Sequence, residues 1–337
     1  MPFTVGFIGC GGISARHLRG FGEHPDCRLV AVADVRRENA ASRAAEFGVD
    51  HIYTDYRELL ERHAPDIVSI NTWTGTHAEI TVAAARAGVK GILCEKPIAR
   101  DLAEVDAMLA ACDAAGTRLA VGHHARFEPR NVTARRLIAE GAIGRPLLLH
   151  NRTEGGLLNN SSHAIDRMRY LLGDVEAAWV LGNVARSTDR YERGEPCEDC
   201  CGAILAFRNG ARAVLESDLP RADWDAPYQV YGAGGNLCFA DALELLDAQG
   251  RRTLDLDPSP TQHQEFVAWL RGECEMRTDV HGNRHTVEIE MALYESARRG
   301  GAVQFPLEPG PSPLVQMIEE GRLVVTTPGR YDIRAKP

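Results

Sequence analysis

A glycine-rich turn near the start of the chain constrains the possible folds more than any other feature. Gly9, Gly11 and Gly12 separate an apolar run typical of a β-strand, residues 4–8, from a helical pattern at residues 13–22. A tight turn that connects a strand directly to a helix is typical of the first unit of a doubly wound parallel sheet. The sequence therefore predicts an α/β fold for the N-terminal part of the chain.

The residues that follow continue the alternation of strand and helix. Short apolar runs lie at residues 28–33, 67–71, 91–94 and 118–121, and helical patterns lie at residues 38–47, 76–87 and 102–115. Strands that alternate with helices form parallel sheets joined by right-handed crossovers. We expect residues 1–122 to form one Rossmann-type domain.

The pattern changes after residue 122. Strand-like runs lie at residues 145–153, 177–184, 203–207, 211–216, 228–231 and 243–246, and helical patterns at residues 127–140, 161–172, 260–270 and 286–298. Asn209-Gly210 between two of the runs is a strong hairpin signal. Residues 123–337 are therefore predicted to form a second α/β domain with an open, mostly antiparallel sheet and helices on one side. The proline-containing tail from Pro306 is expected to be an extended surface strap.

Composition and charge limit the class of protein. The 337 residues are 44% hydrophobic and 25% charged, as in globular proteins, and the net charge is −9. A negative chain is poorly suited to nucleic acid, and no apolar run approaches the roughly 20 residues that span a membrane. We find no signal peptide, so we expect a cytoplasmic protein with no nucleic-acid or membrane partner. Four arginines are interpreted as a solvated helix face: Arg126, Arg130, Arg135 and Arg136.

The nine cysteines are expected to be reduced thiols, because their number is odd and nothing indicates export. Cys197, Cys200 and Cys201 form a C-x-x-C-C cluster, but no second pair follows at the spacing that zinc sites use. His281 and His285 have metal-ligand spacing, yet a glycine and an asparagine between them favour a loop. We therefore predict no metal site, and the role of the cysteine cluster stays open.

The glycine turn has the chemistry of a dinucleotide site. Its glycines let the backbone approach a pyrophosphate, and the helix that begins near Ile13 and Ser14 offers free N–H groups to phosphate. Asp34 ends the second strand, where a carboxylate binds the ribose 2′-hydroxyl and repels a 2′-phosphate. NAD is therefore favoured over NADP, although Arg36 and Arg37 just beyond the strand are able to hold an extra phosphate. The alternative is a plain turn with a helix-capping aspartate.

Lysine usage points to one further residue. The chain has lysine only at Lys90, Lys96 and Lys336, and its other cationic side chains are arginines. Coding bias explains much of this usage. An arginine cannot give up its proton in a protein, however, whereas a lysine can. Lys96 is therefore a candidate for chemistry that an arginine could not perform.

Three segments outside the glycine turn carry a resemblance to a known family. They read NTWTGTH at residues 71–77, CEKP at residues 94–97 and GGLLNNSSHAID at residues 155–166. With the glycine turn, they resemble the glucose–fructose oxidoreductase, inositol dehydrogenase and rhizopine-catabolism family (Gfo/Idh/MocA) over nearly the whole chain. The resemblance implies a Rossmann domain, a second domain with an open sheet, NAD-dependent chemistry on sugars or polyols, and dimers or tetramers that pack through that sheet.

The resemblance also implies roles for individual residues. His163 matches the catalytic histidine, and Asn159 stands four residues earlier, where many polyol dehydrogenases carry aspartate. An amide orients a hydroxyl but accepts no proton. Pro97 often follows a cis peptide bond in relatives. The predicted cofactor-binding residues are Gly9, Gly11, Gly12, Ile13, Ser14, Asp34, Arg36, Thr72, Trp73, His77, Glu95 and Lys96.

Oxidation of an alcohol needs a hydride acceptor, which the cofactor provides, and a proton acceptor. His163 suits proton transfer near neutral pH, and Lys96 stabilises the developing alkoxide or shares the proton transfer. We therefore predict Lys96, His163 and Asn159 as the catalytic residues. Asp166 is expected to orient a helix start or to pair with an arginine. Residues able to hold a polar ring, each with packing or a surface role as an equal alternative, are Trp73, His124, Arg126, Arg152, Asn160 and Trp224.

The leading hypothesis is an NAD-dependent oxidoreductase acting on a hydroxyl of a sugar, sugar acid, cyclic polyol or nucleotide sugar, as a homodimer or homotetramer. One alternative is a glycosidase that retains NAD and cleaves its substrate through transient oxidation. Another is a non-catalytic, NAD-sensing regulator on the same fold, which the presence of both Lys96 and His163 disfavours. The residues alone do not name the substrate or the direction of the reaction.

Overall fold

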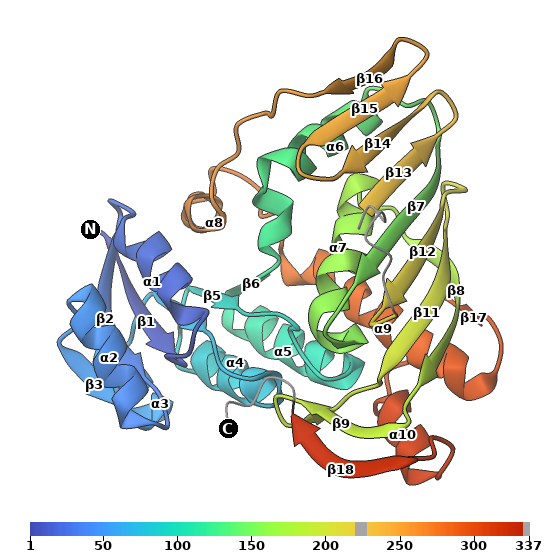
Figure 1. Cartoon of the computed structure of the whole chain (residues 1–337). Coiled ribbons are helices and arrows are strands. Elements are labelled where there is room, and N and C mark those ends of the chain that lie inside the picture. The colour runs from blue at the N-terminus through green and yellow to red at the C-terminus, as the bar shows by residue number, and fades with distance from the viewer. Residues whose placement is uncertain (220–227, 333–337) are drawn as a thin grey trace. The chain divides into compact units, whose positions relative to one another are not determined.

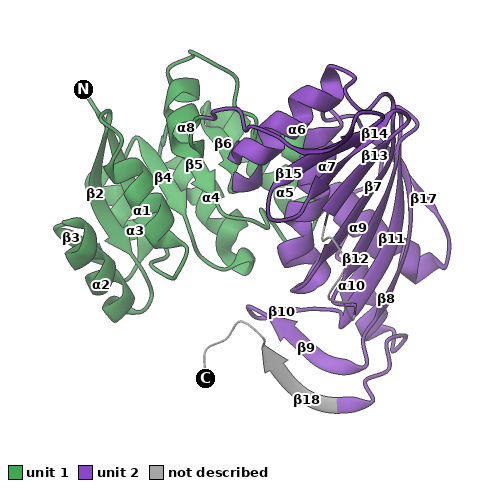
Figure 2. Ribbon diagram, turned by 45° about the horizontal axis from the view of Figure 1, so that its top comes forward, with its two compact units in different colours: residues 1–123, 260–283 green, residues 124–259, 284–337 purple. Residues whose placement is uncertain are grey.

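The structure, a computed structural model, describes residues 1–219 and 228–332 of the chain. Two compact units are distinguished by colour in Figure 2. Unit 1 comprises residues 1–123 and 260–283, and unit 2 comprises residues 124–259 and 284–337. Trp224, which the sequence proposed as a ring-holding residue, lies outside the described residues.

Unit 1 is built on a six-stranded parallel sheet with the strand order β3-β2-β1-β4-β5-β6. Its strands are β1 (Phe3–Ile8), β2 (Cys27–Ala33), β3 (His51–Tyr53), β4 (Ile67–Ile70), β5 (Gly91–Cys94) and β6 (Arg118–Val121). The chain winds outward from β1 in one direction and then from β4 in the other. This is the doubly wound order of a Rossmann fold, so the predicted fold of the first domain is confirmed.

Helices cover both faces of this sheet (Figure 1). One face carries α1 (Ser14–Gly22) and α2 (Arg37–Phe47), and the other carries α3 (Tyr56–His63), α4 (His77–Arg86) and α5 (Leu102–Ala115). The sequence did not predict β3 or α3, because β3 is short and α3 is mostly polar. Only Leu59 and Leu60 of α3 are buried, and they provide the apolar contact that holds it on the sheet.

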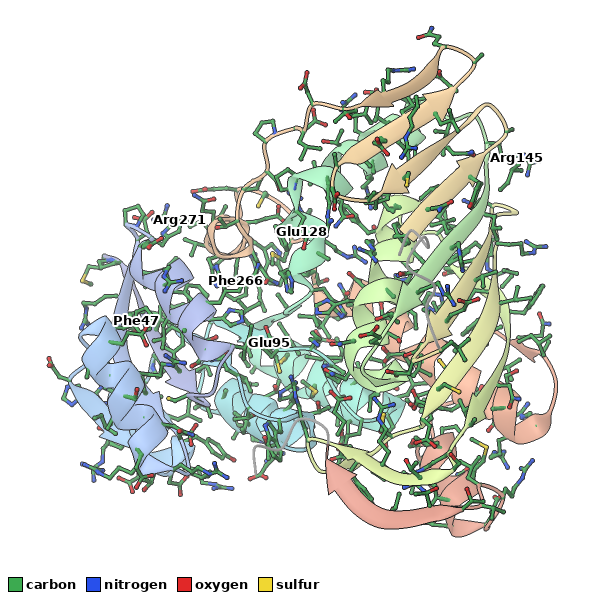
Figure 3. All side chains as sticks on the ribbon, viewed as in Figure 1. Phe47, Glu95, Glu128, Arg145, Phe266 and Arg271 are labelled. Atoms are coloured by element: carbon green, nitrogen blue, oxygen red, sulfur yellow. The ribbon has the colours of Figure 1, made fainter. Side chains whose placement is uncertain are left out.

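Residues 260–283 belong to unit 1, whereas the sequence prediction assigned all of residues 123–337 to the second domain. They include α8 (Gln262–Leu270), where Gln262 Nε2 donates to the carbonyl oxygen of Val121 at 2.7 Å. A Cβ on Gly91 of β5 would lie 2.9 Å from the ring of Phe266, which Figure 3 labels, so glycine leaves the room that the ring needs. These contacts join α8 to the edge of the Rossmann sheet.

Unit 2 contains a nine-stranded sheet with the order β16-β15-β14-β13-β7-β12-β11-β8-β17. Its strands are β7 (Pro146–Thr153), β8 (Ala177–Ala185), β11 (Cys200–Phe207), β12 (Arg212–Ser217), β13 (Tyr228–Gly232), β14 (Gly235–Phe239), β15 (Leu243–Asp247), β16 (Gly250–Thr253) and β17 (Val303–Gln304). All neighbouring pairs are antiparallel except β7 with β12. The hairpin at Asn209-Gly210 is confirmed, with Gly210 at a φ of +87°.

Three helices of unit 2 lie on one face of this sheet: α6 (Pro129–Ala139), α7 (Ser162–Leu171) and α9 (Val280–Arg299) (Figure 1). A Cβ on Gly182 of β8 would lie 2.8 Å from the side chain of Leu293 in α9, so the helix packs closely there. A separate small sheet has the order β10-β9-β18 and consists of β9 (Thr188–Glu192), β10 (Glu195–Pro196) and β18 (Thr327–Asp332).

Two expectations about the second domain are wrong. The tail beyond Pro306 is not simply an extended strap, because Pro313 begins a helix, α10 (Pro313–Glu319), whose Leu314 is buried. His281 and His285 lie in α9 rather than in a loop. The glycine and asparagine between them are tolerated because the helix continues for 20 residues with a strongly buried side.

Those two histidines have separate partners. His281 lies 3.2 Å from Asp113, and His285 lies 2.5 Å from Glu288. Within the described ranges, no group of three or more metal-ligating side chains comes together. All nine cysteines are free thiols, and no described helix is long and apolar enough to span a membrane.

Candidate active site

The glycine turn leaves its backbone open at the carboxyl end of β1. Gly9 has a φ of +90°, and a Cβ there would lie 2.7 Å from the backbone of Asn71. Gly11 and Gly12 are exposed, and a Cβ on either would meet nothing within 4 Å. The first glycine is therefore required by the close packing of the turn, while the other two face open space.

The start of α1 is free to bind an anion. Its N-cap residue, Ile13, makes no side-chain capping bond, so the first N–H groups of the helix remain available. Ser14 is fully buried, and its Oγ donates to the carbonyl oxygen of Gly11 at 2.6 Å. A serine at this position thus closes the turn internally, where the usual pattern has a glycine.

Asp34 links the end of β2 to the glycine turn. One of its carboxylate oxygens accepts from the backbone N–H of Cys10 at 2.7 Å, and the other accepts from the N–H of Arg36 at 2.8 Å. A carboxylate held at this place, beside an open turn and an uncapped helix, fits the ribose and pyrophosphate of NAD. The chain therefore supplies the donors and acceptor that the cofactor needs.

His77 braces two loops that follow neighbouring strands. Its Nδ1 lies 2.9 Å from the carbonyl oxygen of Pro97, and its Nε2 lies 3.1 Å from that of Thr72. Burial lowers the pKa of His77, so the ring stays neutral and donates from one nitrogen at a time. Thr72 is half-buried, and Trp73 is 50% exposed beside it. The predicted cofactor residues after β4 are therefore held by a buried histidine rather than by the sheet alone.

Glu95 and Lys96 lie directly after β5, and both are buried. Lys96 also precedes the cis peptide bond to Pro97 that the family resemblance implied. The backbone N–H of Lys96 donates to Glu95 Oε2 at 3.2 Å. The label in Figure 3 marks Glu95. The predicted strand-end pair is thus fixed as one piece at the carboxyl end of the parallel sheet.

Two histidines that the sequence did not single out hold Glu95 from the other side. His17 Nε2 lies 2.8 Å from Glu95 Oε1, and His17 Nδ1 lies 3.0 Å from His263 Nε2. All three side chains are buried, and burial together with His17 lowers the pKa of His263 to about 3. His263 is therefore neutral at physiological pH. The only local signal was a histidine on the buried stripe of α1, three residues after Ser14.

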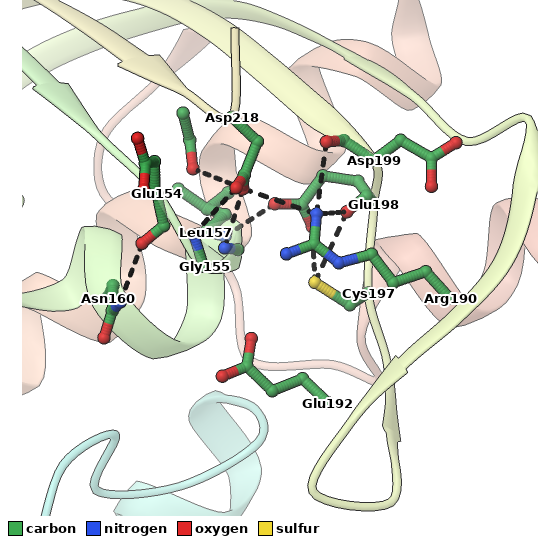
Figure 4. A network of polar contacts seen from close by, with 12 residues as sticks. Glu154, Gly155, Leu157, Asn160, Arg190, Glu192, Cys197, Glu198, Asp199 and Asp218 are labelled. Atoms are coloured by element: carbon green, nitrogen blue, oxygen red, sulfur yellow. Dashed lines mark hydrogen bonds and ion pairs between the residues drawn. The ribbon is translucent and has the colours of Figure 1, made fainter. Parts of the chain in front are cut away.

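In unit 2, the two glycines before α7 are held by carboxylates (Figure 4). The N–H groups of Gly155 and Gly156 each donate to Asp218 at 2.8 Å, and the N–H of Leu157 donates to Glu198 at 2.5 Å. A Cβ on Gly156 would lie 2.5 Å from Cys197 Sγ, and this glycine has a φ of +78°. Glycine is therefore required here by both space and backbone conformation.

The carboxylates of this network are themselves supported. Glu198 Oε2 accepts from the hydroxyl of Tyr294 at 2.7 Å, and Arg190 lies 3.4 Å from Asp218. Burial raises the pKa of Glu198 and of the Cys197 thiol. Cys197 is therefore a protonated, packed thiol, which gives one member of the cysteine cluster a structural place.

Asn159 lies in a π-helical segment, residues 156–161, that the sequence did not predict and that leads into α7. Its Nδ2 donates to Glu192 Oε1 and to the carbonyl oxygen of Gly155, the latter at 3.3 Å. Both amide hydrogens are thus directed toward protein acceptors. A carboxylate, Glu192, therefore lies directly beside Asn159.

The other predicted site residues of unit 2 each contact identified neighbours. His163 and His124 are half-buried, with their rings edge to face and 4.8 Å between centroids. Asn160 Nδ2 donates to the carbonyl oxygen of Glu154 at 2.7 Å. Arg152 forms an ion pair with Glu216 of the neighbouring strand at 2.5 Å. The structure brings His163 and His124 together and gives Arg152 a carboxylate within the sheet.

Arg126 is a buried structural cation rather than part of a solvated helix face. Its guanidinium lies 2.7 Å from Asp166 and 2.8 Å from Asp174, and all but 3% of the side chain is buried. The expectation that Asp166 pairs with an arginine is therefore confirmed. The expectation for the arginine group is wrong at Arg126, because the chain folds α7 directly against it. Contact of Arg126 with a substrate stays a prediction.

Comparison with known proteins bears on both units. Residues 3–123 match a family model described as an oxidoreductase family with an NAD-binding Rossmann fold, and residues 131–238 match the GFO/IDH/MocA C-terminal domain. D-apiose dehydrogenase of Paraburkholderia graminis is 28% identical over 353 residues, which cover 95% of this chain and 94% of that protein. Myo-inositol 2-dehydrogenase of Thermotoga maritima is 30% identical over 269 residues, or 74% and 79% of the two chains.

A solved structure of levoglucosan dehydrogenase, in complex with NADH and levoglucosan, has a TM-score of 0.79 and 25% identity to this chain. It covers 91% of this chain and 100% of its own. The fold and the dinucleotide turn define an NAD-binding oxidoreductase of the Rossmann class. Within that class, the chain belongs to the Gfo/Idh/MocA family.

Replacement of Asp34 tests the cofactor site. We expect Asp34→Ala to weaken NAD binding by roughly 10- to 100-fold, because it removes a charged acceptor and loosens the turn at Cys10. Discrimination against NADP should fall at the same time. Fluorescence titration with NADH and NADPH measures both effects, with the exposed Asp50→Ala as the control. Unchanged NADH affinity in Asp34→Ala would remove this residue from the site.

Replacement of Asn159 tests its contact with Glu192. Asn159→Asp removes the N–H donor and places a second carboxylate against Glu192, so we expect the free energy of unfolding to fall by about 1–3 kcal/mol. The double variant Asn159→Asp/Glu192→Gln restores a donor and should recover most of that loss. Thermal unfolding of the unchanged protein, Asn159→Asp, Glu192→Gln and the double variant gives the comparison. Equal stability of Asn159→Asp and the unchanged protein would contradict the contact.

Proposed function

We propose that this oxidoreductase transfers a hydride between NAD and a hydroxyl-bearing carbon of a sugar, sugar acid, cyclic polyol or nucleotide sugar. The observation that carries the proposal is the state of Lys96, which is only 9% exposed and follows β5 in the same unit as the dinucleotide turn. The other lysine of the described residues, Lys90, has a side chain that is 64% exposed and paired with Asp66. Relatives named for apiose, myo-inositol and levoglucosan support a polyhydroxylated substrate.

The proposal gives each catalytic residue one task. When bound, NAD supplies the hydride acceptor. The ammonium of Lys96 donates a hydrogen bond to the substrate oxygen and stabilises the negative charge that develops there. His163 accepts the hydroxyl proton, and its edge-to-face contact with His124 holds the imidazole in place. Asn159, whose amide hydrogens are already used, offers its carbonyl oxygen to orient a substrate hydroxyl.

The other predicted roles form part of the same proposal. Gly9, Gly11, Gly12, Ile13, Ser14, Asp34, Arg36, Thr72, Trp73, His77 and Glu95 hold or frame the cofactor, and Trp73, His124, Arg126, Arg152 and Asn160 are the substrate residues. The nine free thiols fit a reducing compartment, so we propose the cytoplasm as the site of action.

The two described lysines allow a matched test of the reaction. NADH formation is followed by absorbance on aldoses, inositols, sugar acids, nucleotide sugars and aryl glycosides. We expect turnover on one class and a loss of about 10²- to 10⁴-fold in kcat for Lys96→Met. Lys96→Arg should fail as well, because a planar guanidinium is larger and does not present a compact charge to a single oxygen. Lys90→Met serves as the control and should retain full activity.

Other results of this panel would favour the alternatives. Release of the aryl group from a glycoside without net NADH formation would favour a glycosidase that retains NAD. NADH binding without turnover on any class would favour a non-catalytic regulator. Turnover that survives Lys96→Met would contradict the assigned role of Lys96.

We further propose that copies of this chain associate through the face of the nine-stranded sheet that no described helix covers. Leu181 of β8 and Ile204 of β11 are paired in register, point away from the helices, and are each 44% exposed. Val214 of β12 continues the row beyond Ile204. An apolar row on an otherwise uncovered sheet face is typical of an interface.

Substitution of charged residues into this apolar row tests the proposed association. We expect the unchanged protein to be a dimer or tetramer and the variant Leu181→Glu/Ile204→Glu to be largely monomeric, because two buried carboxylates would oppose the interface. Light scattering coupled to size-exclusion chromatography gives the mass. Leu256→Glu, also at an exposed leucine, should leave the mass unchanged. A monomeric unchanged protein would refute the proposal.

A further inference from the structure

Helix α7 has only two residues that are not buried. They are His163 and Arg167, which stand four positions apart and therefore share one face of the helix. Long side chains on a helix lean toward its N-terminus, so Arg167 extends back toward the turn that carries His163. The face of α7 that bears the proposed proton acceptor thus also bears a cation.

Arg167 is half-buried, and its surroundings differ from those of the buried Arg126. Its guanidinium lies over the ring of Tyr228, 4.1 Å from the centroid. Its Nε is fully buried and donates to no acceptor, and the guanidinium forms no ion pair with any residue in the described ranges. By contrast, Arg126 lies against Asp166 and Asp174.

Tyr228, whose ring lies against the guanidinium of Arg167, also carries a polar group without a partner among the described residues. The residue is 1% exposed, and its hydroxyl has no hydrogen-bond partner among the described residues. Stacking occupies the face of the guanidinium and not its edge, so Arg167 Nε and the Tyr228 hydroxyl are two buried donors without an acceptor among the described residues. Two unsatisfied polar groups in contact are expensive to bury and call for an acceptor from outside the protein.

The charged groups around Arg167 also favour an acceptor from outside the protein. Burial lowers the pKa of Arg167, the neighbouring Arg130 acts in the same direction, and Tyr228 and Glu128 act against it. The guanidinium nevertheless stays protonated at physiological pH. The position therefore holds a positive charge that the described residues do not neutralise.

We propose that Arg167 and Tyr228 bind a carboxylate of the substrate, so that the enzyme acts on an acidic sugar whose reacting hydroxyl lies at His163. This inference rests on the proposed function and narrows its substrate class. A planar carboxylate accepts from the edge of one guanidinium and from one hydroxyl, which matches the donors present. A phosphate dianion is less well matched, since a single cation faces the position.

Matched pairs of sugars test the inference directly. D-Glucuronate and D-galacturonate are compared with D-glucose and D-galactose, with glucose 6-phosphate as the phosphate probe, all at saturating NAD. We expect the unchanged protein to bind the uronates at least 10-fold more tightly than the neutral sugars, by thermal shift and by KM. Arg167→Met should raise the KM for the uronates by roughly 10- to 100-fold and leave that for neutral sugars unchanged.

Further variants separate binding from packing. Arg167→Lys keeps the charge but loses the fork, and Tyr228→Phe keeps the ring but loses the hydroxyl, so both should show intermediate losses on uronates alone. Arg208→Met removes an exposed arginine and serves as the control. NADH affinity should be unchanged in every variant, because the dinucleotide turn lies in unit 1. An unchanged KM for the neutral sugars reports that unit 2 has folded.

The outcomes distinguish this inference from the proposed function. Equal binding of uronates and neutral sugars, or equal losses on both in Arg167→Met, would overturn the carboxylate site, while turnover that depends on Lys96 would leave the proposed function intact. A preference for glucose 6-phosphate would overturn the choice of carboxylate. If none of these sugars is bound or oxidised, the carboxylate site is overturned, while turnover of an inositol or a nucleotide sugar that depends on Lys96 would leave the proposed function intact.

Discussion

The carboxylate of Asp218 accepts hydrogen bonds from two successive backbone N–H groups, and the arrangement of unit 2 around the proposed catalytic histidine depends on it. A turn at positive φ leaves its N–H groups without partners in any regular structure, and a buried donor without an acceptor is costly. Asp218 and Glu198 remove that cost at Gly155, Gly156 and Leu157. The π-helical segment that follows is therefore anchored before α7 begins.

Unit 1 uses the same interaction where the cofactor residues lie. Asp34 accepts from Cys10 in the glycine turn, and Glu95 accepts from the N–H of Lys96. Asp34 and the glycine turn follow different strands, whereas Glu95 and Lys96 are adjacent residues at the end of one strand. A negatively charged protein thus uses part of its carboxylate excess internally, to fix backbone that carries function.

The sequence predicted what depends on neighbours in the chain and missed what depends on distant contacts. The turn at Gly9, the strand β1 and the hairpin at Gly210 follow from local preferences, and the structure contains them. The bond between His17 and His263 joins residues 246 positions apart, so no local pattern could reveal it. The return of residues 260–283 to unit 1 has the same cause, because the packing of Phe266 on Gly91 depends on two remote residues.

The candidate site shows the same division between features that local sequence predicts and features that depend on distant contacts. Family motifs identified Lys96, His163 and Asn159, but the contact of Asn159 with Glu192 and the burial of Arg126 against Asp166 required the fold. The sequence also gave no reason to separate Arg167 from the other arginines near it. Only the fold shows that Arg126 has carboxylate partners whereas Arg167 has an aromatic ring.

The two cations on which the proposals rest, Lys96 and Arg167, differ in their ability to give up a proton. Arg167 keeps its proton under all physiological conditions, which suits a permanent positive charge facing an anionic group. Lys96 is buried, and a lysine in such surroundings can release its proton and can approach a single oxygen as a compact donor. In the proposed assignments, Lys96 faces the oxygen whose charge changes during the reaction, and Arg167 faces a carboxylate whose charge stays constant.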